Sequence, residues 1–383
     1  MKKISGLFIV YIIVLLFPVW GICLDKIQAP LNGTVSQETI PKVDIKKIMN
    51  GEYQYKLDNY LLSKTPGKSI FIKCRSQLLY SLFNVSSNNN VVIGKEKQLF
   101  EPEYLNYNYN IYGQMSKEEV DNLVEKLKIL DSMLEAEDKE LYIFITPSKA
   151  RYYKEYAPSY YELCGNDTEE LDYDKFKREL ETTNINVFDS IEYIDSIKEE
   201  FKYPLWYSTG IHWSRVLGST VAKEFNSYLI EKSKYKLGQI DFSYKVTDVA
   251  ASPDSDLYDT LNLLRSPNET YYAVKAERKS DGEQPKVFLR GGSFMGQSLS
   301  YLISKDIFGD SFHFENNYYF MEKYSKQNVL SNFDAYEEAE EDIKKYIQKS
   351  DMVILEVNEE KIWTMSWGFI DYILEHPEWL ERE

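Results

Sequence analysis

Short apolar runs alternate with helical patterns over most of this chain, and this alternation constrains the fold more than any other feature. The expected strands are residues 141–147, 186–189, 286–290 and 351–357. The expected helices are residues 118–138, 173–182, 190–201, 214–229, 295–304 and 335–349. Strands separated by helices of this length predict βαβ units and a largely parallel sheet, which is an α/β fold. Ligands of such sheets bind outside the carboxyl ends of the strands.

The N-terminus has the pattern of an export signal. Lys2 and Lys3 precede an uncharged apolar run at residues 7–23, which has the length of a signal peptide or a short membrane anchor. We favour an uncleaved anchor over a removed signal peptide, and both over a buried core helix. The positive-inside tendency then places the remaining chain outside the cytoplasm.

Three regions follow from these patterns. Residues 1–24 form the membrane anchor or signal peptide, residues 25–115 form a mixed lead-in region, and residues 116–383 form the main domain. The lead-in region contains a helical pattern starting at Asp44 and an apolar strand pattern at 91–93, after the turn-forming cluster at 86–90.

Charge and residue counts exclude several function classes. The chain carries 45 Lys and Arg against 61 Asp and Glu, a formal charge of −16, which argues against nucleic acid as a partner. The scarce metal-ligating side chains are widely spaced: Cys23, Cys74 and Cys164, and His212, His313 and His376. We therefore expect no metal site. No phosphate loop or dinucleotide fingerprint is present, so we expect no nucleotide cofactor.

The first candidate for chemistry is a serine at a strand-to-helix turn. The apolar run at 287–289 is followed by Arg290, two glycines and then Ser293, where a helical pattern begins. A serine at such a turn presents its hydroxyl at the carboxyl edge of the sheet, beside helix N–H groups that can stabilise an oxyanion. The alternative is that Ser293 only caps the helix.

The second candidate is His212, which lies between aromatic residues in a loop before the helix at 214–229. A partly dry environment of this kind can tune an imidazole for general-base catalysis. The alternative is a structural histidine. We interpret His313 and His376 as structural, because neither has a comparable sequence context.

Three motifs together resemble the SGNH-hydrolase-like proteins that O-acetylate bacterial exopolysaccharides, the AlgJ and AlgX group. The motifs are P-S-K at 147–149, T-G-I-H-W at 209–213 and G-G-S-F at 291–294. Histidine precedes serine, as in that family, and the resemblance covers roughly residues 45 to 360. It implies a three-layer SGNH-hydrolase-like domain in which Ser293 is the nucleophile and His212 is the base.

We also expect supporting roles for other residues near these motifs. Backbone N–H groups around Gly292 to Phe294 are the expected oxyanion donors, Lys149 or Arg290 would give electrostatic support, and Trp213 is a candidate for sugar binding. Lys149 could equally be structural, and Trp213 could pack beneath the histidine loop.

Two motif positions depart from the family pattern. Many relatives have Asp where this chain has Gly210, and their serine motif commonly has Asp where this chain has Gly292. The third triad member is therefore open at this point. The possible suppliers are Asp189, Asp254, Asp256 and Glu356.

The function that the resemblance implies is transfer of an acetyl group, through an acetyl-serine, onto hydroxyls of an alginate-like or cellulose-like polysaccharide outside the cytoplasm. No acetyl-CoA is present there, so a membrane-bound O-acyltransferase is the implied acetyl donor. A polysaccharide acetyl esterase and a non-catalytic polysaccharide-binding component are the alternatives.

Overall fold

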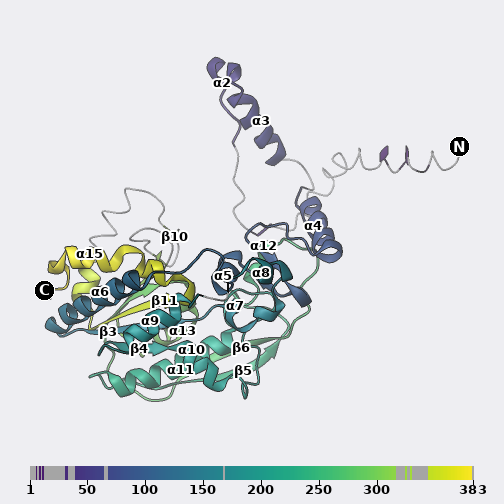
Figure 1. Ribbon diagram of the computed structural model, residues 1–383. Helices are drawn as coiled ribbons and strands as arrows, with labels where there is room; N and C mark the ends of the chain where they lie inside the picture. Colours follow the sequence, from purple (N-terminus) through teal and green to yellow (C-terminus); the bar gives the residue numbers. More distant parts are fainter. Residues whose placement is uncertain are drawn as a thin grey trace. The chain divides into compact units, whose positions relative to one another are not determined.

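The fold is that of a computed structural model of the 383-residue chain (Figure 1). It describes residues 39–63, 68–166, 169–315 and 344–381, with short pieces at residues 6, 8–9, 11–12, 31–32, 324–325 and 328–329. Most of the apolar run at 7–23 lies outside the described residues. None of the helices within the described residues is both long and apolar enough to cross a membrane.

The chain divides into two compact units. One unit comprises Met1–Ile93 and Leu257–Asn268, and the other comprises Gly94–Asp256 and Glu269–Glu383. The three regions expected from the sequence, with boundaries at residues 24 and 115, stay a prediction.

The first unit is mainly helical where it is described. Its elements are α2 (Ile45–Met49), α3 (Glu52–Ser63), α4 (Lys68–Leu78), the π-helix Leu79–Phe83 and β1 (Val92–Ile93). The helix expected from Asp44 is present, and the Asp44 carboxylate caps it by accepting the N–H groups of Lys46 and Lys47.

A five-stranded parallel sheet forms the centre of the second unit. Its strands are β3 (Glu140–Thr146), β4 (Asn186–Asp189), β7 (Val287–Gly291), β8 (Ser311–Glu315) and β11 (Met352–Asn358). Their order is β4-β3-β11-β7-β8, and every neighbouring pair is parallel. Every residue of β7 and β11 is buried, as expected for parallel strands covered on both faces. The predicted parallel α/β sheet is confirmed.

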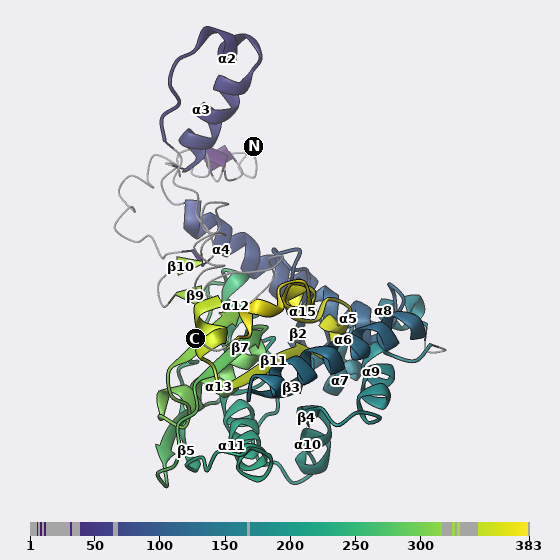
Figure 2. The same ribbon diagram turned by 90° about the vertical axis from the view of Figure 1, so that its left-hand side faces the viewer.

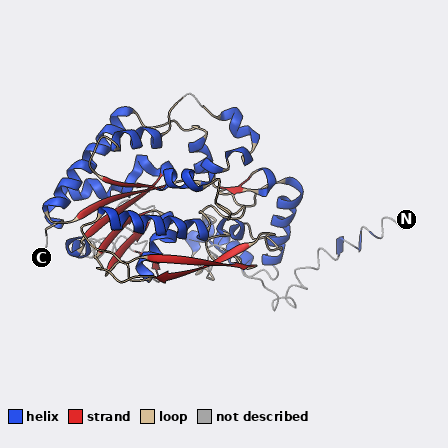
Figure 3. Cartoon of the chain, turned by 90° about the horizontal axis from the view of Figure 1, so that it is seen from below, coloured by secondary structure: helices blue, strands red, loops and turns tan. Residues whose placement is uncertain are grey.

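Helices cover both faces of this sheet (Figure 2). On one face lie α6 (Lys117–Ala136), α9 (Asp172–Leu180) and α15 (Phe369–Glu375), and on the other lie α10 (Ser190–Ile197), α11 (Arg215–Lys232) and α13 (Ser293–Ser304). Side chains of β3 alternate between the two cores: Ile143 packs in the first and Phe144 in the second. The second unit is therefore a three-layer sandwich, in which helices flank the strands (Figure 3).

Shorter elements complete the described chain. They are β2 (Leu99–Phe100), α5 (Pro102–Asn108), α7 (Lys149–Tyr152), α8 (Ser159–Cys164), β5 (Ile240–Thr247), α12 (Asp256–Thr260), β6 (Tyr271–Arg278), β9 (Tyr324–Ser325) and β10 (Asn328–Val329). Four segments are 3-10 helices: Lys95–Lys97, Lys154–Tyr156, Glu359–Gly368 and Pro377–Trp379. Strands β5 and β6 form an antiparallel pair that the sequence patterns did not indicate. Of the helix expected at 335–349, residues 344–349 are helical and the remainder lies outside the described residues.

The parallel topology gathers three segments at one edge of the sheet. Strand β3 ends at Thr146, β7 ends at Gly291 and β11 ends at Asn358. Because the carboxyl ends of parallel strands lie at the same edge, the residues that follow these strands are neighbours. The two predicted motifs at 147–149 and 291–294 and the segment after β11 therefore meet there.

Candidate active site

Ser293 stands at a sharp strand-to-helix turn. Strand β7 ends at Gly291, Gly292 is the N-cap residue, and Ser293 is the first residue of α13. A Cβ atom added to Gly291 would lie 2.5 Å from the Cβ of Glu356, so β7 approaches β11 too closely for a side chain there. The capping role considered for Ser293 is wrong, because Gly292 holds the cap position and the serine hydroxyl bonds to a histidine.

Ser293, His212 and Asp256 form a hydrogen-bonded chain. The Oγ of Ser293 lies 2.7 Å from Nε2 of His212, and Nδ1 of the same ring lies 2.5 Å from Oδ2 of Asp256. A carboxylate can only accept, so Nδ1 carries the proton and Nε2 accepts from the serine hydroxyl. The second oxygen of Asp256 accepts the N–H of Ile211 at 2.9 Å, which fixes the carboxylate. This is the arrangement of a serine nucleophile, a general base and an orienting carboxylate.

Gly210 explains why the carboxylate comes from elsewhere. A Cβ atom at this position would lie 2.9 Å from the backbone oxygen of Asp254, so the loop has no room for an aspartate there. Asp256, which lies 44 positions after His212 in the sequence, supplies the carboxylate instead.

The other three possible suppliers have different tasks. Asp189 caps α10 and accepts the hydroxyl of Tyr173 at 2.7 Å. Asp254 accepts the N–H of Arg215, at the start of α11, at 3.1 Å. Glu356 binds the nucleophile turn.

Glu356 holds this turn from the neighbouring strand. Its side chain is buried, one oxygen accepts the hydroxyl of Thr146 at 2.5 Å, and the other accepts the N–H of Gly292 at 2.5 Å. The Gly292 N–H is therefore engaged, which corrects its expected role as an oxyanion donor. The N–H groups of Ser293 and Phe294 come next in α13, and helix geometry gives them no acceptor within the helix.

Lys149 is not among the residues that line the hollow at Ser293. It is buried, and its Nζ donates to the backbone carbonyls of Tyr207 at 2.7 Å, Ser208 at 3.2 Å and Gly210 at 3.1 Å. Burial lowers the pKa of Lys149 to about 7, whereas three carbonyl acceptors match the three N–H donors of its charged form. The expected electrostatic role of Lys149 is therefore replaced by a positioning role, in which Lys149 holds the loop that carries His212.

Arg290 and Trp213 are also placed away from the reacting atoms. Arg290 is buried, donates from Nε to the carbonyl of Ser366 at 3.3 Å, and has its guanidinium 4.9 Å from the ring centre of Trp367. It supports a turn rather than an oxyanion. Trp213 is fully buried and lies edge-on to Phe294, with 5.6 Å between ring centres. Packing beneath the histidine loop is therefore its role, and the expected sugar contact is wrong.

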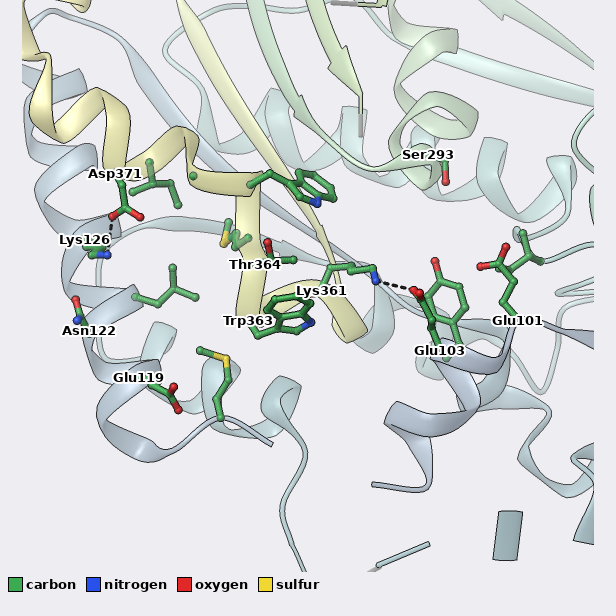
Figure 4. A pocket seen from close by; sticks show the side chains of 18 of the residues that line it. Glu101, Glu103, Glu119, Asn122, Lys126, Ser293, Lys361, Trp363, Thr364 and Asp371 are labelled. Carbon is green, nitrogen blue, oxygen red and sulfur yellow. Dashed lines mark hydrogen bonds and ion pairs between the residues drawn. The ribbon is translucent and has the colours of Figure 1, made fainter. Parts of the chain in front are cut away.

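Ser293 and His212 open into a cavity of about 1030 Å³ (Figure 4). Its walls include Glu101, Tyr104, Lys361, Trp363 and Trp367, none of which the sequence motifs indicated. Two positional signals could have found these residues. Glu101 directly follows β2. Lys361, Trp363 and Trp367 lie in the segment after β11, at the carboxyl edge of the sheet.

Within the described residues, the other histidines and the potential metal-binding side chains form no second candidate site. His376 lies 3.3 Å from Glu378 and packs against the ring of Tyr372, as a structural histidine would. The side chain of His313 lies outside the described residues. Across the described ranges, no group of three or more His, Cys, Asp or Glu side chains is placed to hold a metal ion.

Two carboxyl groups beside the cavity have strongly shifted pKa values. Burial, and next the charge of Glu103, raise the pKa of Glu101 to about 7. Burial also raises the pKa of Glu360 to about 7, against the opposing effect of Lys361. Each group therefore changes its charge near neutral pH, and Glu101 does so within the electrostatic range of His212.

Replacing Glu101 with glutamine should stabilise the protein at high pH only. The folded pKa of Glu101 lies above the unfolded value of about 4.3, so the folded state binds more protons between these pH values and stability is lost as pH rises through this window. We expect Glu101→Gln to gain about 1–3 kcal/mol at pH 8 and close to nothing at pH 4, measured by urea unfolding. Glu118→Gln, at an exposed position of α6, is the control. An equal gain at both pH values would contradict the prediction.

The fold and the site define a class: an α/β domain with a Ser–His–Asp relay at the carboxyl edge of a parallel sheet. A family model described as the SGNH hydrolase-like domain of the acetyltransferase AlgX matches residues 91–353. The chain therefore belongs to this family of SGNH hydrolase-like acetyltransferase domains. A search of curated proteins gives no match.

Solved structures similar to this chain include three bacterial proteins. The O-acetyltransferase domain of Pseudomonas putida AlgJ is 16% identical, with a TM-score of 0.46 over 75% of this chain and 99% of that one. Pseudomonas aeruginosa AlgX is 14% identical, with a TM-score of 0.43 over 78% of this chain and 69% of that one. Bacillus cereus PatB1, with a sulfonyl adduct, is 11% identical, with a TM-score of 0.48 over 73% of this chain and 97% of that one.

Proposed function

We propose that this protein is an extracytoplasmic O-acetyltransferase that moves an acetyl group through Ser293 onto hydroxyls of a polysaccharide. The observation that carries the proposal is the relay of Ser293, His212 and Asp256 at the wall of a large cavity, in a chain of an acetyltransferase family. A cavity of this size has room for several sugar units beside an acyl group.

The first half-reaction acetylates the enzyme. Oγ of Ser293 attacks the carbonyl carbon of an acetyl donor while its proton passes to Nε2 of His212. The bond between the carbonyl carbon and the leaving group breaks, and the leaving group takes the proton from Nε2. Asp256 stabilises the imidazolium between these two steps. The N–H groups of Ser293 and Phe294 are the proposed donors to the oxyanion.

The second half-reaction returns the serine. A sugar hydroxyl attacks the acetyl carbonyl and gives its proton to Nε2 of His212, the ester bond to Oγ breaks, and Ser293 takes the proton back. Water competes with the sugar at this step, so an acetyl esterase uses the same residues. The proposed source of acetyl groups is a membrane-bound O-acyltransferase, beside which an N-terminal anchor would hold the domain.

The test is intact-protein mass spectrometry of the full chain after exposure to 4-nitrophenyl acetate. We expect one acetyl adduct on Ser293, which disappears in Ser293→Ala and His212→Ala and persists in the control Ser300→Ala, an exposed position of the same helix. Transfer of the label to added oligosaccharide supports the transferase, whereas release only to water supports the esterase. A folded protein that forms no adduct but binds polysaccharide would make it a binding component.

A further inference from the structure

The cavity at the triad continues into a longer groove. A second hollow of about 460 Å³ shares five lining residues with the first. The shared residues are Glu103, Met115, Glu119, Lys361 and Trp363. In Figure 4, Ser293 and Glu101 lie at one end of the first hollow, whereas Glu119, Lys126 and Asp371 lie at the other. The groove therefore leads away from the nucleophile and can hold a chain of sugars rather than a single one.

Trp363 provides an aromatic face in this groove. It lies in the segment after β11, lines both hollows and keeps 62% of its surface exposed. A large exposed indole is unusual unless it has a ligand to cover, and an indole presents a flat apolar face with one N–H donor. The apolar face of a pyranose ring fits such a surface, so the position of Trp363 points to a sugar beyond the one that receives the acetyl group.

The charge of the groove is strongly one-sided. The acidic lining residues of the two hollows are Glu101, Glu103, Glu119, Asp172, Glu360 and Asp371. The basic ones are Lys126 and Lys361, and both form ion pairs with these same carboxylates. Lys126 lies 2.6 Å from Asp371, and Lys361 lies 2.8 Å from Glu103 and 2.9 Å from Glu360. Among the described lining residues, the two lysines pair with three of the six carboxylates, so the lining stays acidic and neither lysine is without a partner before a ligand enters.

A polyuronate would meet strong repulsion in such a groove. It carries one carboxylate per sugar, and each would lie among the carboxylates of Glu103, Glu119 and Asp371, while both lysines of the lining already have carboxylate partners. Like charges brought together across an interface cost several kcal/mol. A neutral sugar meets no such repulsion, and its hydroxyls can donate hydrogen bonds to the carboxylates. An amino sugar would gain from its positive charge.

We propose that the acceptor is a glycan without anionic groups, and that the carboxylates of the groove select against polyuronates such as alginate. This inference rests on the proposed transfer of acetyl groups from Ser293 to a polysaccharide. Uncharged glycans and glycans of amino sugars both present a row of free hydroxyls that can receive the acetyl group. Neutral and cationic chains are distinguished by the experiment.

The experiment offers hexamers of glucose in β-1,4 linkage, of glucosamine and of mannuronate to the full chain with 4-nitrophenyl acetate as donor. We expect kcat/KM for sugar acetylation to be at least about tenfold lower with the mannuronate hexamer at low salt, and the gap to narrow at high salt because salt screens the repulsion. A mannuronate hexamer that is accepted as well as the others would overturn the inference.

A triple variant tests the carboxylates directly. Glu103→Gln, Glu119→Gln and Asp371→Asn together should raise the kcat/KM ratio of mannuronate to glucose hexamer by about tenfold. Glutamine at 119 preserves the capping box of α6. The matched control combines Glu118→Gln, Glu125→Gln and Glu135→Gln, which are exposed positions of α6 outside the groove, and should leave the ratio unchanged. An equal change in both triples would overturn the inference.

A binding measurement separates this inference from the proposed function. Calorimetric titration of Ser293→Ala with the three hexamers needs no chemistry. If no acetyl-serine forms on the parent chain but the variant prefers the glucose or glucosamine hexamer, the proposed function fails and the groove inference holds. If the acetyl-serine forms and the variant binds only mannuronate, or binds none of the three, the groove inference fails alone.

Discussion

Asp256→Asn should slow acetylation of Ser293 by about 10³–10⁴-fold at neutral pH while the fold remains intact. The introduced asparagine can keep its oxygen on the N–H of Ile211, and its NH₂ group then faces Nδ1 of His212 as a donor. To accept at Nδ1, the imidazole must carry its proton on Nε2. Nε2 then no longer accepts the proton of Ser293, so the tautomer rather than the geometry is lost. The rate of Ser293 acetylation can be measured by stopped-flow detection of the 4-nitrophenolate that 4-nitrophenyl acetate releases.

The control for this prediction is Asp259→Asn, an exposed position of the same short helix. It removes one negative charge at a similar place in the sequence and should acetylate at the parent rate. Thermal unfolding of both variants should match the parent. A parent-like rate in Asp256→Asn would mean that the carboxylate has no part in orienting His212.

The layers of the fold could be predicted because burial on both faces leaves a clear pattern. Strands β3, β7 and β11 are mostly apolar, since helices cover both sides of them. The pair β5–β6 was missed for the opposite reason. Its residues alternate between partly buried and exposed positions, so its composition is mixed and it has no apolar run.

The proposed nucleophile and base could be located from the sequence, whereas the carboxylate that bonds to the histidine could not. Ser293 and His212 are marked by local features, a strand-to-helix turn and an aromatic loop. Asp256 has no local signal, because only the folded chain brings it beside a histidine 44 positions away. Proximity to a motif was also misleading for Trp213 and Arg290. The sequence indicates where these residues sit along the chain but not which side of the backbone their side chains occupy.

Lys149→Met should destabilise the protein by about 3 kcal/mol and also lower the rate of Ser293 acetylation. Methionine has a similar length but donates no hydrogen bond. The carbonyl of Gly210 would lose its buried donor, whereas those of Tyr207 and Ser208 keep the backbone N–H groups of Gly210 at 3.4 Å and Leu99 at 2.9 Å. The cost combines one unsatisfied carbonyl, about 1–3 kcal/mol, with the loss of two hydrogen bonds to a charged group. Relief of the desolvation of the lysine charge, which the lowered pKa of Lys149 indicates, offsets part of this cost.

Stability and rate together distinguish positioning from direct catalysis by Lys149. A group that acts on the oxyanion would lower the rate without a matching loss of stability, because its contact exists only in the transition state. A group that fastens the histidine loop changes both, since the loop carrying Gly210 and His212 loses its anchor in the resting protein. The free energy of unfolding in urea and the rate of 4-nitrophenolate release should therefore both fall in Lys149→Met. Both should stay at parent values in Lys202→Met, which changes an exposed lysine. Loss of rate with unchanged stability would restore the electrostatic role.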